Sequence, residues 1–347
     1  MSDRLTIIEI AKDAGVSRST VSRVINDDPN VSAETRKHVR AVMQKRNYLP
    51  NAAARGLAAG KTRILGLVIP MRVSALFVDP YFPQLIQGIS NACNQNDYST
   101  MLWLAEPEYE RRMLRQIVSS GLIDGVVIAS ALNDDPLIEA LRQNAVPFVL
   151  IGRHTTYSDI NYVDVDNRVA ARDAVMYLLR LGYKRVATIA GSLKMIAGAD
   201  RLSGYKDALK ARGISPDPAL IVESDFTEAG GYEAMLRLLR QNPDAVFVAN
   251  DVMALGAMRA LREAGKRVPQ DVALIGFDDM PFAERTEPPL TTVRQPIQRT
   301  GYVATELLIE VLNARDSAPR RIVLPTELVI RESCGTHLVD EKRVLKK

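Results

Sequence analysis

Apolar side chains recur with helical spacing at the start of the chain and predict two short amphipathic helices. The apolar faces of these helices consist of Ile7, Ile10, Ala11, Ala14, Val21, Val24 and Ile25. Thr6 and Glu9 match a capping box at the first helix, Gly15 permits a sharp exit from it, and Ser17 can cap the second. The same spacing predicts a third helix over about 33–46, so this region is typical of a three-helix helix-turn-helix unit.

After residue 63 continuous apolar runs alternate with amphipathic helical segments. The runs expected to form strands are Ile64–Ile69, Ser99–Leu104, Gly125–Ala129, Phe148–Ile151, Arg185–Ala190, Ala245–Ala249, Val272–Ile275 and Arg321–Leu328. The segments expected to form helices are Phe82–Asn94, Glu108–Ser119, Pro136–Gln143, Ala170–Leu181, Arg201–Arg212, Gly230–Arg240, Met253–Ala264 and Gln298–Leu312. This alternation predicts an α/β protein with two consecutive open parallel sheets, whose strand ends border a ligand cleft.

A Pro-started, Ala-rich segment separates these two regions. Asn51 can cap a short helix in it and Gly60 can end that helix. A helix this short is marginal in water, so we expect it to form only with support from DNA or a partner subunit. The chain therefore divides into a headpiece at 1–50, a hinge at 51–62 and a large domain at 63–340.

Positive charge is concentrated at the front of the chain. Residues 1–62 contain 11 Lys and Arg against 6 Asp and Glu, whereas the whole chain has a formal net charge of only +4. Such a distribution attracts phosphates and makes binding depend on salt. Arg18, Ser19, Ser22 and Arg23 point away from the apolar face of the second helix, and Arg there can pair with guanine in the major groove. We therefore predict binding to double-stranded DNA.

Several other function classes are not expected. The polar start has no apolar signal region and no run reaches the roughly 18 apolar residues of a membrane span, so we expect a cytoplasmic protein without membrane contact. Cys93 and Cys334 form no CxxC pair and no histidines cluster, so neither a metal nor a cofactor is expected. The chain lacks a nucleophile elbow, a zinc-protease motif and a true P-loop, so we expect no catalytic residues and no enzyme.

Five motifs, in this order and spacing, resemble the LacI/GalR family of bacterial transcriptional regulators. They are Ile10–Asn26, Tyr48-Leu-Pro-Asn-Ala, Phe247–Ala257, Gly276-Phe-Asp-Asp279 and Pro289-Leu-Thr-Thr292. The resemblance extends from Leu5 to about Cys334. It implies that the large domain is a two-lobed, periplasmic-binding-protein-like domain for effector binding and dimerisation. The first lobe would comprise about 63–163 and 293–326, and the second about 164–292 and 327–340.

The resemblance also implies a homodimer whose two headpieces bind the half-sites of a pseudo-palindromic operator. Arg18 and Ser19 align with the positions that select the operator sequence, and Arg23 with a further major-groove contact. Leu57 matches the hinge leucine that wedges into the minor groove and kinks the duplex. The residues expected at DNA are Thr6, Ser17, Arg18, Ser19, Thr20, Ser22, Arg23, Asn26, Asn51, Arg55 and Leu57.

An effector site between the lobes is implied as well. Its expected residues are Asp166, Arg201, Phe226, Asn250 and Asp278 in the second lobe, and Asp79, Tyr81 and Phe82 in the first. Carboxylates accept hydrogen bonds from sugar hydroxyls, a guanidinium donates to them, and an aromatic face covers the C–H patch of a sugar ring. A sugar is therefore the expected effector. A nucleobase corepressor is the alternative, because the same side chains can hold a purine.

These observations together predict a repressor whose operator affinity is controlled by a small effector that closes the two lobes. The α/β lobes alone would also suit a solute-binding protein of a transport system. The basic helix-turn-helix and the lack of a secretion signal favour the regulator. Trp103, at the end of a predicted strand, is expected in the core rather than at the ligand.

Overall fold

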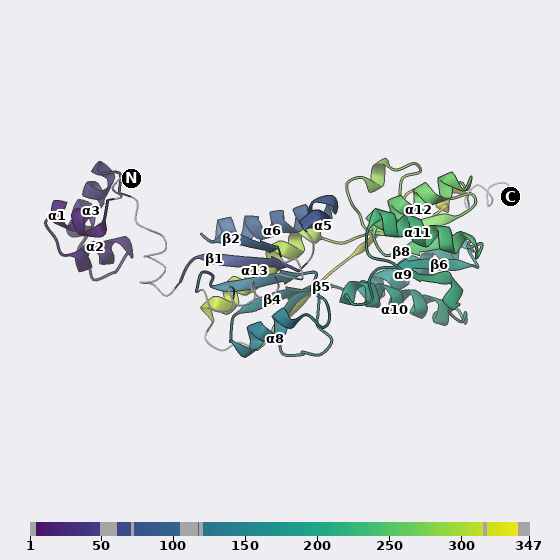
Figure 1. Cartoon of the computed structure of the whole chain (residues 1–347), viewed down its shortest axis with the longest axis horizontal. Coiled ribbons are helices and arrows are strands. Elements are labelled where there is room, and N and C mark those ends of the chain that lie inside the picture. Colours follow the sequence, from purple (N-terminus) through teal and green to yellow (C-terminus); the bar gives the residue numbers. More distant parts are fainter. Residues whose placement is uncertain are drawn as a thin grey trace.

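The computed structural model describes residues 5–48, 61–70, 73–104, 117, 121–314 and 318–338. Its front forms the predicted three-helix headpiece, with α1 (Ile7–Asp13), α2 (Arg18–Ile25) and α3 (Ala33–Lys45) (Figure 1). Gly15 has φ +63°, which suits a residue without a Cβ in the turn between α1 and α2. The headpiece has its own small core, made of Ile10, Ala11, Ala14, Val21, Val24 and Val39.

Side-chain caps fix the ends of the headpiece helices. The Thr6 hydroxyl accepts a hydrogen bond from the Glu9 backbone N–H, and the Glu9 carboxylate accepts one from the Thr6 backbone N–H at 2.7 Å. Ser17 caps α2 and Ser32 caps α3, each through its hydroxyl oxygen. These contacts satisfy backbone donors that a helix leaves unpaired at its start, so the boundaries of all three helices follow from local sequence.

The first sheet has the strand order β11-β5-β4-β3-β1-β2, and every pair in it is parallel. Its strands are β1 (Ile64–Ile69), β2 (Ser99–Leu104), β3 (Gly125–Ala129), β4 (Phe148–Ile151), β5 (Asn161–Val165) and β11 (Arg321–Leu324). One core cluster joins this sheet to α6 (Tyr81–Gln95) and α13 (Ile297–Asn313), and another joins it to α8 (Pro136–Gln143). The short helix α5 (Val73–Val78) precedes α6. Apart from Ile117, the helix predicted over Glu108–Ser119 lies outside the described residues.

The second sheet has the order β12-β10-β9-β8-β6-β7 and is parallel except for the β10–β12 pair. Its strands are β6 (Val186–Ala190), β7 (Ile221–Glu223), β8 (Ala245–Val248), β9 (Ala273–Asp278), β10 (Thr291–Arg294) and β12 (Glu327–Val329). Helices α9 (Asn167–Leu181) and α10 (Ile196–Ala211) pack in one core cluster, and α11 (Glu228–Leu239) and α12 (Asp251–Glu263) in another. Short 3₁₀ helices lie at Pro218–Leu220 and Ala283–Arg285.

The chain passes between the two sheets after β5, after β10 and after β11. The single strand predicted over Arg321–Leu328 is wrong, because β11 and β12 belong to different sheets. Pro325 stands between them, and proline has no N–H with which to continue a ladder. The predicted lobe boundary at 163 falls inside β5 and the one at 293 falls inside β10. The division into domains stays a prediction.

Figure 1 shows the two lobes side by side, each with a sheet flanked by helices, and the headpiece at one end of the chain. None of the helices in the described part of the chain combines the length and the apolar character that a bilayer span needs.

Candidate functional site

A cavity lies between the two lobes, where loops follow the carboxyl ends of the parallel strands. Its empty volume is about 1050 Å³ including the solvent space at its mouth. Seven of the eight predicted effector residues line it, namely Asp79, Tyr81, Phe82, Arg201, Phe226, Asn250 and Asp278. Tertiary structure thus brings together side chains from both halves of the chain.

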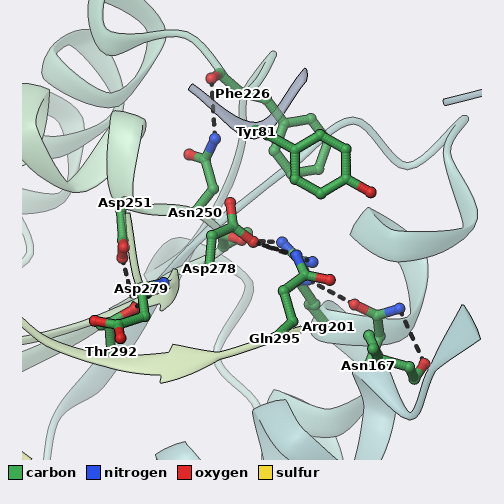
Figure 2. A network of polar contacts seen from close by, with 12 residues as sticks. Tyr81, Asn167, Arg201, Phe226, Asn250, Asp251, Asp278, Asp279, Thr292 and Gln295 are labelled. Atoms are coloured by element: carbon green, nitrogen blue, oxygen red, sulfur yellow. Dashed lines mark hydrogen bonds and ion pairs between the residues drawn. The ribbon is translucent and has the colours of Figure 1, made fainter. Parts of the chain in front are cut away.

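Arg201, on α10, is the most extensively bonded cation of the cavity, and its side chain is 5% exposed. Its Nε donates to Asn167 Oδ1 at 2.9 Å (Figure 2). Nη1 donates to the Ala249 carbonyl oxygen at 2.5 Å. Nη2 lies 3.6 Å from Asp278 Oδ1. The guanidinium also stacks on Phe277, 3.6 Å from the ring centroid. Burial lowers the pKa of Arg201, and the Asp278 carboxylate opposes this shift.

Asp278 ends β9 in an unusual backbone conformation. Its φ is +109°, a value that side-chain-bearing residues rarely adopt, so the surrounding structure must hold it there. Gln295 Nε2 donates to Asp278 Oδ1 at 2.5 Å. Burial raises the pKa of Asp278 to about 7, and the Arg201 guanidinium opposes this rise. The site therefore contains a carboxyl group that changes its charge near neutral pH.

The turn after Asp278 is held by Asp251, which is fully buried. Asp251 accepts a hydrogen bond from the Met280 backbone N–H at 2.8 Å and from the Thr292 hydroxyl at 2.6 Å. Gly276 leaves room for this carboxylate, because a Cβ there would lie 2.2 Å from Asp251 Oδ1. Burial raises the pKa of Asp251 well above its usual value. These contacts fix the direction in which Asp278 points.

Asn250 and Phe226 form a second part of the wall. Asn250 Oδ1 caps α12 by accepting from the Met253 N–H at 2.9 Å, and Nδ2 donates to the Phe226 carbonyl oxygen at 3.2 Å. Phe226 has φ +66°, and its ring lies against Gly191. A Cβ at Gly191 would lie 1.9 Å from Phe226 Cζ, so only glycine leaves the ring in this place. Asn250 therefore caps a helix and lines the cavity at once.

The first lobe contributes Asp79, Tyr81 and Phe82 at the start of α6. Asp79 Oδ1 accepts from the Tyr81 backbone N–H at 2.9 Å, and burial raises the pKa of this carboxyl group. Burial also raises the pKa of Tyr81. Phe82 is part of the first-lobe core and packs edge-on against Tyr81, with 5.2 Å between ring centroids. Phe82 supports the wall from behind, while Asp79 and Tyr81 supply polar atoms.

Asp166 is the predicted residue that the structure does not bring into the cavity lining. It is exposed and caps α9, accepting from the Val169 N–H at 2.9 Å. Asp164, two residues earlier on β5, lines the cavity, and burial raises its pKa to about 6. Asp166 lies just after the last residue of β5 and caps the next helix, so its side chain is exposed whereas that of Asp164 is buried.

Sequence reasoning missed the lining residues that follow β4, Arg153 and His154. Their signal was available, because they come directly after a buried strand and a glycine. His154 Nδ1 accepts from the backbone N–H groups of Thr156 at 3.1 Å and Tyr157 at 3.2 Å. In neutral His154 the ring proton is therefore on Nε2, where it can donate to a ligand.

Residues of the two lobes contact each other beside the cavity. Both terminal nitrogens of Arg153, after β4, donate to the carboxylate of Asp200 on α10, with 2.6 Å between Nη2 and Oδ1. The Asn133 N–H donates to the Lys194 carbonyl oxygen at 2.9 Å. Met280, from the second lobe, is buried in the first-lobe core. These contacts hold the lobes together in the state described here.

Trp103, which was expected in the core, packs against the first-lobe core cluster that contains α8, and it is not among the residues lining the cavity. In the described ranges no group of three or more His, Cys, Asp and Glu side chains could hold a metal ion. Cys93 and Cys334 are buried free thiols.

The headpiece presents part of α2 to solvent. Arg18, Ser19 and Arg23 are exposed, and the Ser17 hydroxyl accepts from the Thr20 N–H at 3.1 Å. Asn26 ends the helix and is also exposed, whereas Thr6, Thr20 and Ser22 serve as caps or are partly covered. The predicted hinge residues Asn51, Arg55 and Leu57 lie outside the described residues. The roles predicted for all of these residues stay predictions.

Several other basic side chains of the headpiece form ion pairs within it. Arg36 and Arg40 on α3 lie 2.8 Å and 2.5 Å from Asp27 Oδ1, and Arg46 lies 2.9 Å from Asp13. These arginines join α3 to the turns beside it. On α2, Arg18 and Arg23 are exposed, and Arg23 Nε lies 3.8 Å from Asp28 Oδ2.

Comparison with known families and structures agrees with this geometry. Residues 6–51 match the family described as bacterial regulatory proteins of the lacI family, and residues 175–334 match a periplasmic binding protein-like domain. The HTH-type transcriptional regulator CelR of Thermobifida fusca is 39% identical, over 95% of this chain and 98% of that protein.

Solved structures resemble the whole chain. A transcriptional regulator CelR–cellobiose complex is 37% identical with a TM-score of 0.76, covering 95% of this chain and 100% of the other. The lac repressor dimer bound to operator and the anti-inducer ONPF is 29% identical with a TM-score of 0.83, covering 96% and 99%. Both the headpiece and the two-lobed domain are thus shared with proteins of known architecture. The chain belongs to the lacI family of bacterial regulatory proteins.

Proposed function

We propose that this protein is a transcriptional repressor that binds a pseudo-palindromic operator as a homodimer. Its affinity for the operator changes when a sugar binds between its lobes. It acts in the cytoplasm, where the operator DNA is, and it catalyses no reaction on its effector. The observation that carries this proposal is the combination of a helix-turn-helix headpiece with an interlobe cavity that contains charged and aromatic side chains on one chain.

The exposed face of α2 supports DNA binding. Arg18 and Ser19 stand in the first turn of the helix, free of ion pairs with carboxylates in the described headpiece, and Arg23 lies one turn later. A helix N-terminus with Arg and short polar side chains suits the major groove, where Arg donates to guanine O6 and N7. We assign operator selection to Arg18 and Ser19, and minor-groove insertion to Leu57 of the hinge.

The chemistry of the cavity supports a sugar effector. Arg201 and His154 offer donors, Asp164 and Asp278 offer acceptors, and Phe226 offers an aromatic face. Vicinal hydroxyls of a sugar match such mixed donors and acceptors, and the C–H patch of a pyranose matches the ring. The similarity to a CelR–cellobiose complex and the size of the cavity make cellobiose the first sugar to test.

Coupling between the two functions follows from the contacts that join the lobes. The Arg153–Asp200 pair joins the loop after β4 to α10, and the Asn133–Lys194 hydrogen bond joins two loops; these segments also line or flank the cavity. A ligand held by residues of both lobes changes how the lobes meet, and in a dimer that alters the spacing of the headpieces. Typical coupling free energies of this kind are about 1–3 kcal/mol.

Two measurements test the proposal together. A gel shift of genomic fragments with the purified full-length protein should reveal a salt-sensitive preference for particular sequences, because cation–phosphate contacts release counterions. Differential scanning fluorimetry against a panel of sugars and nucleobases should then give a raised melting temperature with a sugar. A shift with nucleobases alone would replace the sugar with a corepressor of that class. Turnover of the bound compound would contradict the assignment as a non-enzyme.

A matched pair of variants separates the two activities. Arg18→Ala should abolish the sequence preference in the gel shift and leave the sugar-induced rise in melting temperature intact. Arg201→Met should remove the rise and leave basal DNA binding intact. Absence of any sequence preference, with or without the panel compounds, would refute the assignment as a DNA-binding regulator.

A further inference from the structure

The described cavity lining contains more carboxylates than guanidinium groups, and both guanidinium groups are already paired with carboxylates of the protein. Among the described lining residues, carboxylates come from Asp79, Asp164, Asp225 and Asp278, whereas guanidinium groups come only from Arg153 and Arg201. Both guanidiniums already face carboxylates of the protein, Arg201 that of Asp278 and Arg153 that of Asp200. A bound phosphate group requires cations or backbone N–H groups that are not already neutralised.

The Arg153–Asp200 ion pair determines how much of the positive charge of Arg153 is available to a ligand. Arg153 is part of the cavity lining, and its side chain is 39% exposed. Asp200 is 8% exposed and is not itself a lining residue. Two parallel N–H···O bonds satisfy the carboxylate and turn the guanidinium toward the protein. Asp200 therefore neutralises the positive charge of Arg153 without lining the cavity itself.

The start of α10 lies on the same side of the cavity. Met195, Ile196 and Ala197 line it, and no side chain caps this helix end. Backbone N–H groups there can donate to a sugar hydroxyl. Arg153 and these N–H groups would also suit an anion, but Asp200 on the first turns of α10 offsets both the guanidinium and the partial charge of the helix end. Removing one negative charge would change the preference of this region.

We propose that Asp200 sets the charge selectivity of the effector site, so that the protein responds to an uncharged sugar and rejects the same sugar when it carries a phosphate. This inference rests on the proposed function, because it names the class of sugar that the interlobe cavity accepts. A phosphate monoester brings about −1.5 to −2 charges at pH 7 into a cavity with more carboxylates than cations. Sugar hydroxyls need only the hydrogen-bonding groups already present.

The electrostatics of the neighbouring carboxyl groups point the same way. Burial raises the pKa of Asp278 to about 7 and that of Asp164 to about 6. Burial in the cavity therefore disfavours the charged form of these carboxyl groups. A phosphate group bound there would be poorly solvated for the same reason.

Isothermal titration calorimetry on the full-length protein tests the proposal with cellobiose and cellobiose 6′-phosphate as probes. The wild type should bind cellobiose roughly 100-fold more tightly than its phosphate, since charge-assisted hydrogen bonds to phosphate are missing. Asp200→Asn frees Arg153 and should shift the ratio of the two affinities by at least about tenfold toward the phosphate. The ratio cancels any effect of the substitution on lobe closure that both probes share.

Two further variants isolate the cause. Asp207→Asn is the matched control, because Asp207 is on the same helix and pairs with Arg168 at 2.6 Å, a residue that does not line the cavity. Its affinity ratio should equal that of the wild type. In Arg153→Met/Asp200→Asn the gain toward the phosphate should disappear, since the freed cation is gone.

The outcomes separate this inference from the proposed function. Equal or tighter binding of the phosphate by the wild type, or an unchanged ratio in Asp200→Asn, overturns the inference while a sugar effector stands. If the wild type binds neither probe, the choice of cellobiose fails. In that case, cellobiose 6′-phosphate binding that appears in Asp200→Asn and not in Asp207→Asn still supports the role of Asp200. If Asp200→Asn also fails to bind the phosphate, the inference is overturned.

Discussion

Arg201 offers the sharpest test of the energetics of the cavity. Arg201→Met keeps an unbranched side chain, shorter than that of arginine, and removes the charge and the hydrogen-bond donors. The substitution leaves the Asn167 amide oxygen and the Ala249 carbonyl oxygen without their partner and Asp278 without its cation. Breaking a buried charged network of this kind costs about 3–5 kcal/mol. The free energy of unfolding should fall by that amount.

The ionisation of Asp278 makes the prediction dependent on pH. Because the pKa of Asp278 is about 7, its carboxylate is mostly charged at pH 8 and mostly protonated at pH 5.5. A double-mutant cycle of Arg201→Met and Asp278→Asn should therefore give a coupling energy of roughly 1–3 kcal/mol at pH 8. At pH 5.5 the coupling should be much smaller, because a neutral carboxyl group attracts the guanidinium only weakly.

Urea denaturation followed by far-UV circular dichroism measures the four unfolding free energies at each pH. The control is the matched cycle of Arg168→Met and Asp207→Asn, a solvent-screened pair whose coupling should stay well below that of positions 201 and 278 at pH 8. A coupling between positions 201 and 278 that is absent at pH 8, or equally large at pH 5.5, would refute the reasoning.

Further predictions concern single residues of the two-lobed domain and of the headpiece. Since burial raises the pKa of Asp278 to about 7, far above its unfolded value, the group takes up a proton on folding between about pH 4 and 7. Its contribution to stability should therefore increase as pH falls through 7, by at most about 1.4 kcal/mol per pH unit, and Asp278→Asn should remove this slope in urea denaturation curves. Gly191→Ala places a Cβ 1.9 Å from Phe226 Cζ and should weaken sugar binding about tenfold in calorimetry while operator binding persists. Ser17→Ala should destabilise α2 by about 1 kcal/mol, seen as a lower first transition in melting curves. Arg18→Ala should lower operator affinity by about 1–3 kcal/mol and relax base preference at one position per half-site, measured by gel shift with single-base operator variants.

The sequence predicted most elements because their signals are local. The strands β1 to β4 begin and end where their apolar runs do, and the headpiece helices begin after the predicted caps. The strands that were missed, β5, β7 and β10, are short or mix polar with apolar residues, as in Thr291–Arg294. Such strands are stabilised by pairing with neighbours far along the chain, which no local pattern encodes.

The candidate site was predicted only in part. Motif matches named Arg201, Asn250 and Asp278, and all three are lining residues; Arg201 is on α10, Asn250 caps α12 and Asp278 ends β9. They also placed a carboxylate at Asp166, which is exposed and does not line the cavity, and they did not identify Asp164 on β5 of the first sheet, which does. The pairing of Arg153 with Asp200 was out of reach, since 47 residues separate the two and they meet only where one lobe touches the other.

The sequence by itself determined the helix-turn-helix unit, the α/β class, the concentration of positive charge in residues 1–62 and the family. These depend on residue type and short-range spacing, which the chain carries regardless of how it folds. Only the tertiary structure decided which side chains share the cavity, which cations are neutralised and which carboxyl groups lose their water. Burial and charge pairing depend on distances between residues remote in sequence, and folding alone creates those distances.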